Sequence, residues 1–259
     1  MSKPKGCNVA LWLAEDLADE GGFVTLRVAI EGTLQTRLRS LSQEQISDLA
    51  ESLEPGVFAE LGCIADRVIQ LGTEPSFSLE GEPGSAYVRA QNRAAPAALS
   101  AIRQFLPTPF EDFCAALLSA LGATAHRVGG TGDGGVDFIA TDLPVSSHSL
   151  AALRASRPIV IGQAKRYGDN SLITVTQLRE FVGAAVLRAE EEKRSGPRTG
   201  LLTPVCFAFW TTSDFNSPAW AFAQRAGLWC LNGLALAQLA LRVGLPLAET
   251  EVPDALRTK

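Results

Sequence analysis

The sequence has 259 residues, 46% of them hydrophobic and 20% charged, which is enough for one large or two modest folded domains and excludes a disordered chain. Its N-terminal apolar stretch is short and is interrupted by Glu15 and Asp16, which fits neither a signal peptide nor a membrane span. We therefore expect a cytoplasmic protein without membrane contact. Five scattered cysteines without a CxxC pair favour neither a disulfide framework nor a zinc site, and we expect all except Cys7 to be core residues.

The net charge of -5 is unevenly distributed along the chain. Residues 1–99 hold 8 Lys and Arg against 14 Asp and Glu, a balance of -6, whereas residues 100–259 hold 15 against 14, a balance of +1. Polyanion binding depends on local basic patches and not on the average charge. The second part is therefore compatible with DNA, and the first is a poor candidate for gripping it.

The first part, residues 1–95, predicts a small acidic α+β domain. Alternating apolar residues in Phe23–Ile30, a turn at Glu31-Gly32 and the segment Leu34–Leu38 predict a two-stranded hairpin. Ser42 and Gln45 have the spacing of a capping box, which predicts that a helix begins there.

That first helix is expected to end at about Leu53, and a second is expected over Val57–Leu71. The segment Thr73–Pro96 is rich in Gly, Pro and Ser and contains GEPGS, so it predicts a loop or an interdomain linker that extends to about residue 106.

The second part, residues 107–259, predicts an α/β domain with the order αβββαβ, followed by an αβα tail. A helix begins after Pro107 and Pro109 and ends at Gly122, and a glycine-rich turn GGTGDGG separates two short strands. The later elements, all predicted from apolar periodicity, are a strand at Ile159–Lys165 after a loop of roughly 17 residues, a helix from about Thr174 to Glu192, a strand at Val205–Trp210 and a helix opening at Ser217-Pro218.

Polar residues with catalytic potential gather at the end of the strand Ile159–Lys165. Alternation puts Gln163 and Lys165 on one face, about 7 Å apart. Asp137 can meet them if the preceding strand pairs alongside, and Glu111 borders the apolar stripe of the first helix while Asp112 faces solvent. Oxygen ligands for a hard cation together with an ammonium group are what phosphodiester hydrolysis requires.

Each of these residues alone has an ordinary structural explanation. Asp137 could cap loop amides, and Glu111 could complement a helix dipole. Lys165 alone reads as a surface residue at a strand end, and Gln163 alone as a satisfied polar group. Their occurrence together and in order favours the catalytic interpretation.

The ordered segments PFEDF, GDGGVDFI, IVIGQAKRY and LREFVGAAV, with AFWTTSDFNSPAWAFAQRAG and LWCLNGLALAQL behind them, resemble the Mrr-like branch of the PD-(D/E)xK nucleases over roughly residues 107–241. The resemblance implies a restriction-endonuclease-like fold with a central mixed sheet flanked by helices. It also implies four roles, namely Asp137 and Glu111 as metal ligands, Gln163 as an oxygen ligand in place of a carboxylate, Lys165 as the catalytic lysine, and the Ala164 carbonyl as a further ligand.

Other motifs carry less weight. Gly130, Gly132 and Gly135 satisfy GxGxxG, but a strand and not a helix follows them, which disfavours a dinucleotide site. His126 and His148 have no metal-ligand spacing. The segment 211–214, TTSD, could contact a phosphate or simply cap a turn between strand and helix.

We therefore expect a magnesium-dependent endodeoxyribonuclease, with Mn²⁺ as a substitute ion, that acts in defence against foreign or modified DNA. Arg166, Tyr167 and Arg179 are the expected contacts to the DNA backbone. The alternatives are a catalytically silent nucleic-acid-binding or scaffold subunit, and a nuclease effector controlled by a protein partner through the acidic first domain. A homo-oligomer is compatible with either class.

Overall fold

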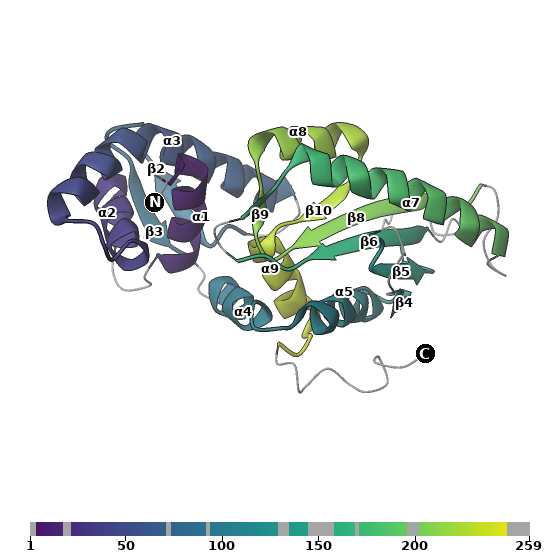
Figure 1. Cartoon of the computed structure of the whole chain (residues 1–259). Helices are drawn as coiled ribbons and strands as arrows, with labels where there is room; N and C mark the ends of the chain where they lie inside the picture. Colours follow the sequence, from purple (N-terminus) through teal and green to yellow (C-terminus); the bar gives the residue numbers. More distant parts are fainter. Residues whose placement is uncertain are drawn as a thin grey trace. The chain divides into compact units, whose positions relative to one another are not determined.

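The computed structural model describes residues 4–17, 22–70, 74–91, 94–128, 135–144, 158–168, 171–195 and 202–247. The chain divides into two compact units, Met1–Ala97 (unit 1) and Ala98–Lys259 (unit 2), and most of their helices and strands are labelled in Figure 1. Within the described residues, no helix is both long enough and apolar enough to cross a lipid bilayer.

Unit 1 combines helices with a three-stranded antiparallel sheet of order β1-β3-β2. Its elements in chain order are α1 (Gly6–Asp16), β1 (Val24–Thr25), α2 (Leu26–Arg37), α3 (Gln43–Gln70), β2 (Phe77–Glu80) and β3 (Tyr87–Ala90). The β2–β3 hairpin follows the second and third helices along the chain. Phe77 and Val88 are buried on the inner side of the sheet.

The predicted hairpin of Phe23–Ile30 with Leu34–Leu38 is wrong, because most of this segment forms helix α2. Thr25 caps the helix by accepting a hydrogen bond from the Val28 N–H group. The sequence also carries a helical stripe, and it is this stripe that is buried: Leu26, Ile30, Thr33 and Leu34.

Two further expectations for unit 1 are corrected. The two predicted helices are one helix, α3, which continues through Pro55. The predicted linker Thr73–Pro96 instead holds the β2–β3 hairpin, with Gly81 and Gly84 at positive φ in its turn. The reciprocal capping bonds between Ser42 and Gln45 are present, at 3.0 and 3.3 Å.

Unit 2 is built on a five-stranded mixed sheet of order β10-β8-β6-β5-β4, in which β6, β8 and β10 are parallel and β4 and β5 antiparallel. A two-stranded parallel sheet joins β7 and β9. The strands are β4 (Thr124–Arg127), β5 (Phe138–Thr141), β6 (Ile159–Lys165), β7 (Leu172–Ile173), β8 (Val205–Thr211), β9 (Asp214–Phe215) and β10 (Trp229–Leu231).

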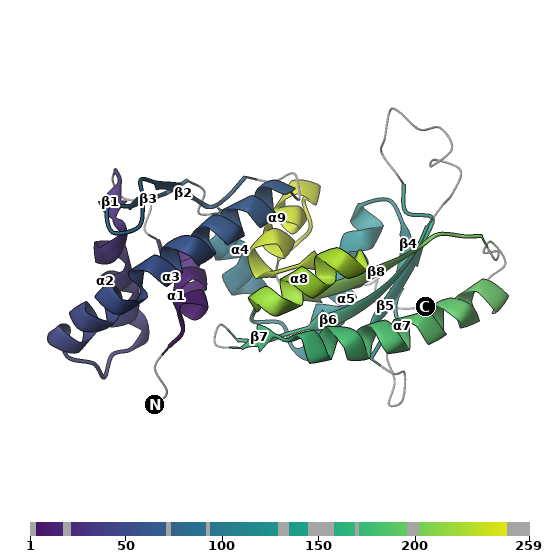
Figure 2. The same cartoon turned by 90° about the horizontal axis from the view of Figure 1, so that it is seen from above.

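Helices cover both faces of this sheet, with α7 and α8 on one face and α5 and α9 on the other (Figures 1 and 2). The helices are α4 (Ala94–Ile102, at the boundary between the units), α5 (Pro107–Ala120), α7 (Val175–Ser195), α8 (Ser217–Ala226) and α9 (Gly233–Val243). The predicted mixed sheet flanked by helices is confirmed. The small β7–β9 sheet was not predicted.

Some predictions for the loops fall outside the described residues, and those for the cysteines are confirmed only in part. The turn at 129–134 and most of the loop before β6, including His148, lie outside the described residues. Cys114 and Cys230 are buried as expected, but Cys206 is only half-buried and Cys63 is exposed, so the expectation for Cys63 is wrong. Cys63 lies on α3 next to Ile64, which takes the buried position of the helix.

Candidate active site

Asp137 is fixed to the strands on both of its sides. It lies directly before β5, where its backbone N–H group donates to the Gly162 carbonyl at 2.8 Å and its carbonyl accepts from the Val128 N–H group at 2.9 Å. Its side-chain Oδ2 accepts a hydrogen bond from the Ala164 N–H group at 2.8 Å. The carboxylate is therefore held against the backbone of β6, one residue from Lys165.

Gln163 is buried beside the glycine that precedes this aspartate. Its side chain is 6% exposed. Gly135 has φ +88°, and a Cβ atom at that position would lie 2.7 Å from the Gln163 Nε2 atom. The positive φ favours glycine at position 135, and a side chain there would also displace the Gln163 amide.

Helix α5 brings Glu111 to the same region. Cys114, one turn further along α5, is fully buried, and burial raises the pKa of its thiol well above the usual value. The carboxylates of Asp137 and Glu111 raise this pKa further, because both lie close enough to disfavour a thiolate. Both carboxylates thus act on the same thiol although they come from different elements.

Arg127 of β4 pairs with both acidic residues of α5. Its Nε atom lies 3.0 Å from Asp112 Oδ1, and its Nη1 atom lies 3.6 Å from Glu111 Oε2. Each carboxylate side chain is 21% exposed. The expectation that Asp112 faces solvent is therefore wrong, because the antiparallel β4 places a guanidinium group beside it.

Lys165 is the last residue of β6 and lies opposite Thr211 of β8 in the parallel register. The Thr211 hydroxyl donates to the Lys165 carbonyl at 2.8 Å. Thr211, Thr212 and Ser213 are completely buried, and each hydroxyl donates to a backbone carbonyl. Of the two interpretations of the TTSD segment, the structural one describes these hydroxyls.

The three residues expected to contact DNA have different environments. Arg166 is exposed directly after β6, and its Nη1 atom donates to the Arg103 carbonyl at 3.1 Å. The Tyr167 hydroxyl accepts from Gln177 Nε2 at 2.8 Å. Arg179 extends from α7 to α8, where its guanidinium carbon lies 5.6 Å from the centroid of the Phe222 ring.

The proposed donors suit a hard cation. Asp137 and Glu111 offer carboxylates, Gln163 an amide oxygen and Ala164 a backbone carbonyl. No group of three or more His, Cys, Asp and Glu residues occurs in the described segments that could hold a metal by themselves. Mg²⁺ commonly takes one or two carboxylates and completes its shell with water and substrate phosphate, so this donor set fits Mg²⁺ and does not fit Zn²⁺.

Sequence reasoning overlooked several residues that hold this region. Arg103, Cys114 and Gly135 were not considered as parts of the site, and Thr212 was weighed only as a phosphate contact or a cap. The one available signal was three consecutive hydroxyl residues after a strongly apolar strand. Their hydroxyls can replace ladder bonds where a strand ends.

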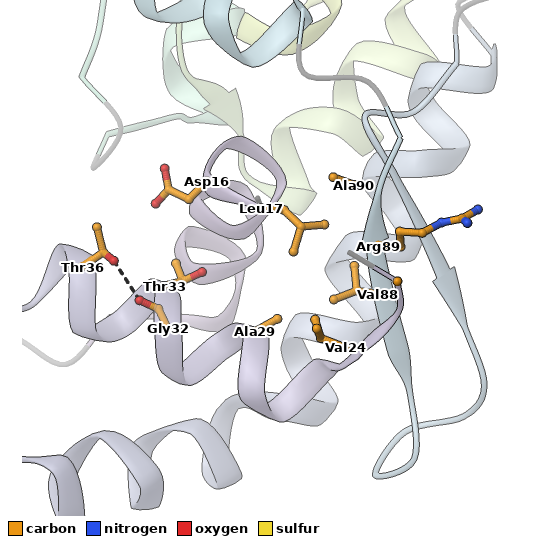
Figure 3. Close-up of a pocket in the computed structure, with 11 residues that line it drawn as sticks. Asp16, Leu17, Val24, Ala29, Gly32, Thr33, Thr36, Val88, Arg89 and Ala90 are labelled. Carbon is orange, nitrogen blue, oxygen red and sulfur yellow. Dashed lines mark hydrogen bonds between the residues drawn. The ribbon is translucent and has the colours of Figure 1, made fainter. Parts of the chain in front are cut away.

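Unit 1 has a pocket of its own, with a volume of about 290 Å³, between the end of α1, helix α2 and strand β3 (Figure 3). Two of its polar residues are engaged within the protein. Asp16 forms paired hydrogen bonds with Arg37, both at 2.6 Å, and the Thr36 hydroxyl donates to the Gly32 carbonyl at 2.9 Å. The pocket is formed entirely by residues of unit 1 and is separate from the residues described above.

Comparisons with known proteins concern unit 2. The Mrr_cat family model, described as a restriction endonuclease, matches residues 102–196. The solved structure of the MspJI restriction endonuclease in complex with a 27-mer oligonucleotide is 21% identical, with a TM-score of 0.42 over 64% of this chain and 35% of that chain. The DNA modification-dependent restriction endonuclease AspBHI is 19% identical, with a TM-score of 0.43 over 64% of this chain and 40% of that chain.

The chain thus spans less than half the length of either protein. No curated protein sequence matches it significantly.

Proposed function

We propose, from the premise that residues 102–196 form a restriction endonuclease domain of the Mrr_cat family, that this chain is a magnesium-dependent endodeoxyribonuclease. The observation that carries the proposal is the hydrogen bond between Asp137 Oδ2 and the Ala164 N–H group. It joins the candidate metal-binding carboxylate to the strand that ends in Lys165. Glu111 of α5 and Gln163 of β6 are the further oxygen donors that we propose.

We assign metal binding and transition-state stabilisation to different residues. Asp137, Glu111, Gln163 and the Ala164 carbonyl would hold the ion, which when bound supplies positive charge to the phosphate and acidifies a water molecule. In hydrolysis, a water oxygen bonds to phosphorus as the bond to one sugar oxygen breaks, and that sugar oxygen takes up a proton. We assign the Lys165 ammonium to orienting the attacking water and stabilising the charge that develops on the phosphoryl oxygens.

The substrate is DNA, and restriction of foreign or modified DNA is the role that we propose. Arg166 and Tyr167 follow Lys165 directly and are the proposed contacts to the DNA backbone. Unit 1 carries the excess negative charge, so we assign its function to a protein partner or to regulation.

Cleavage of several nucleic acids in the presence of different metals tests the proposal. Plasmid DNA, linear duplexes with and without base modification, single-stranded DNA and RNA would each be incubated with Mg²⁺, Mn²⁺, Zn²⁺ or excess chelator. We expect cleavage of DNA with Mg²⁺ or Mn²⁺ only. DNA binding without cleavage under any of these metals would instead support the silent binding subunit, and full activity in chelator would exclude metal dependence.

A further inference from the structure

The chain just beyond β6 is held by one buried threonine. Thr212 is completely buried, and its hydroxyl accepts from the Tyr167 N–H group at 2.9 Å and donates to the Tyr167 carbonyl at 2.7 Å. Its own N–H group donates to the Lys165 carbonyl at 3.3 Å. The side chain of Thr212 thus replaces the ladder partner that the chain lacks at Tyr167, and its backbone N–H group holds the residue on the other side of Arg166.

Thr212 also connects this segment to two arginines. Its carbonyl accepts from Nε and Nη2 of Arg103 at 3.1 and 3.0 Å. The Arg103 carbonyl in turn accepts from Nη1 of Arg166 at 3.1 Å. The backbone that carries Lys165 and Arg166 is therefore tied through Thr212 and Arg103 into one network.

We propose that Thr212 is the positioning residue of the nuclease site, which orients Lys165 and Arg166 toward the phosphodiester through these bonds. The inference rests on the proposed function of that site. Because the hydroxyl is buried and both donates and accepts within the protein, it acts through its neighbours and not on DNA. Residues that orient a site from behind in this way typically change metal affinity or activity by about 10- to 100-fold when they are replaced.

Three variants isolate the hydroxyl. Thr212→Val keeps the branched shape and removes the oxygen, Thr212→Ser keeps the oxygen, and Ser213→Ala removes an equally buried hydroxyl that donates to the Ser171 carbonyl instead. We expect Thr212→Val to lower the single-turnover rate of DNA cleavage at saturating Mg²⁺ and saturating DNA by about 10- to 100-fold. Thr212→Ser should restore the rate, and Ser213→Ala should keep it. Equal rates for Thr212→Val and the wild type, or equal losses for the Val and Ser variants, would overturn the proposal.

A structural measurement separates this inference from the proposed function. Amide hydrogen exchange over residues 165–168 should accelerate in Thr212→Val and not in Ser213→Ala, whether or not the wild type cuts DNA. If the wild type cuts no DNA, the proposed function fails, and unchanged exchange would independently overturn the positioning role. If Thr212→Val does not fold, Arg103→Lys breaks the paired bonds to the Thr212 carbonyl instead; a wild-type rate and unchanged exchange in that variant would contradict the network.

Discussion

The Asp137 carboxylate accepts a hydrogen bond from the Ala164 N–H group at 2.8 Å, although 27 residues separate the two in the sequence. This bond holds an acidic side chain against the end of β6, at the residue before Lys165. It gives Asp137 a structural role in addition to the metal-binding role that we propose, and the two roles can be separated by substitution.

Asp137→Asn should abolish cleavage while preserving the fold, because an amide oxygen still accepts from the Ala164 N–H group but no longer offers a charged metal ligand. Asp137→Ala should lose cleavage and should also lower the free energy of unfolding by about 1.5 to 3 kcal/mol, the usual contribution of a hydrogen bond to a charged group. Urea unfolding and single-turnover cleavage measure the two effects. A wild-type cleavage rate in Asp137→Asn would contradict the assignment of a metal ligand.

Gly135→Ala tests the packing against Gln163. The backbone at φ +88° should cost about 1 to 2 kcal/mol of stability, and the added Cβ should displace the Gln163 amide and raise the Mg²⁺ concentration for half-maximal cleavage by about 10-fold or more. Gly227→Ala is the matched control, since its φ is +68° and no atom lies within 4 Å of the added Cβ. The control should lose stability without any change in the Mg²⁺ requirement. An equal change in both variants would show that Gln163 does not bind the ion.

The buried cysteines predict a loss of stability in alkaline solution. Burial raises the pKa of Cys230 to about 12 and the pKa of Cys114 well above the usual 9.0. Both thiols therefore stay protonated in the folded state while the unfolded chain ionises above about pH 9, so their stabilisation is complete below pH 9 and is lost as the pH rises. For each thiol, the free energy of unfolding should fall by about 1.4 kcal/mol between pH 7 and pH 10.

Urea unfolding at several pH values checks this prediction. A variant with alanine at positions 114 and 230 should be less stable at every pH because it contains cavities, but its stability should fall less steeply above pH 9. An unchanged slope in this variant would contradict the buried, protonated state of the two thiols.

The sequence predicted an element best where a segment carries the pattern of only one kind of secondary structure. The run Ile159–Lys165 is mostly apolar and is buried nearly throughout, and β6 has the predicted bounds. Phe23–Ile30 instead carries two patterns, since Val24, Leu26, Val28 and Ile30 alternate while Leu26, Ile30 and Leu34 have helical spacing. The helix prevails because its stripe is buried in unit 1 and Thr25 caps it, which leaves Val28 58% exposed.

For the candidate site, the sequence order of Glu111, Asp137, Gln163 and Lys165 was enough to predict that they come from α5, the start of β5 and the end of β6. The hydrogen bonds that hold the backbone around them could not be predicted. The bonds from Thr212 to Tyr167 and from Arg166 to Arg103 join residues 45 and 63 positions apart. Such pairings depend on strand order and not on local pattern.

The charge of unit 1 gives a prediction about its part in DNA binding. Its helix α3 carries six acidic residues and one arginine. Because these carboxylates repel phosphate, we expect that deleting residues 1–93, which leaves α4 whole, does not weaken DNA binding. Fluorescence anisotropy of a labelled duplex measures the affinity. A folded fragment with tenfold weaker binding would show instead that unit 1 reads DNA.

The most direct test of the account is the single-turnover rate of Lys165→Ala on a DNA substrate that the wild type cuts with Mg²⁺. Removing one well-placed electrostatic group should lower the rate by about 100- to 1,000-fold, or roughly 3 to 4 kcal/mol, while the Kd for DNA and its salt dependence stay close to those of the wild type. Circular dichroism must first show that the variant is folded. A wild-type rate in folded Lys165→Ala would contradict the assignment of this site as the nuclease centre.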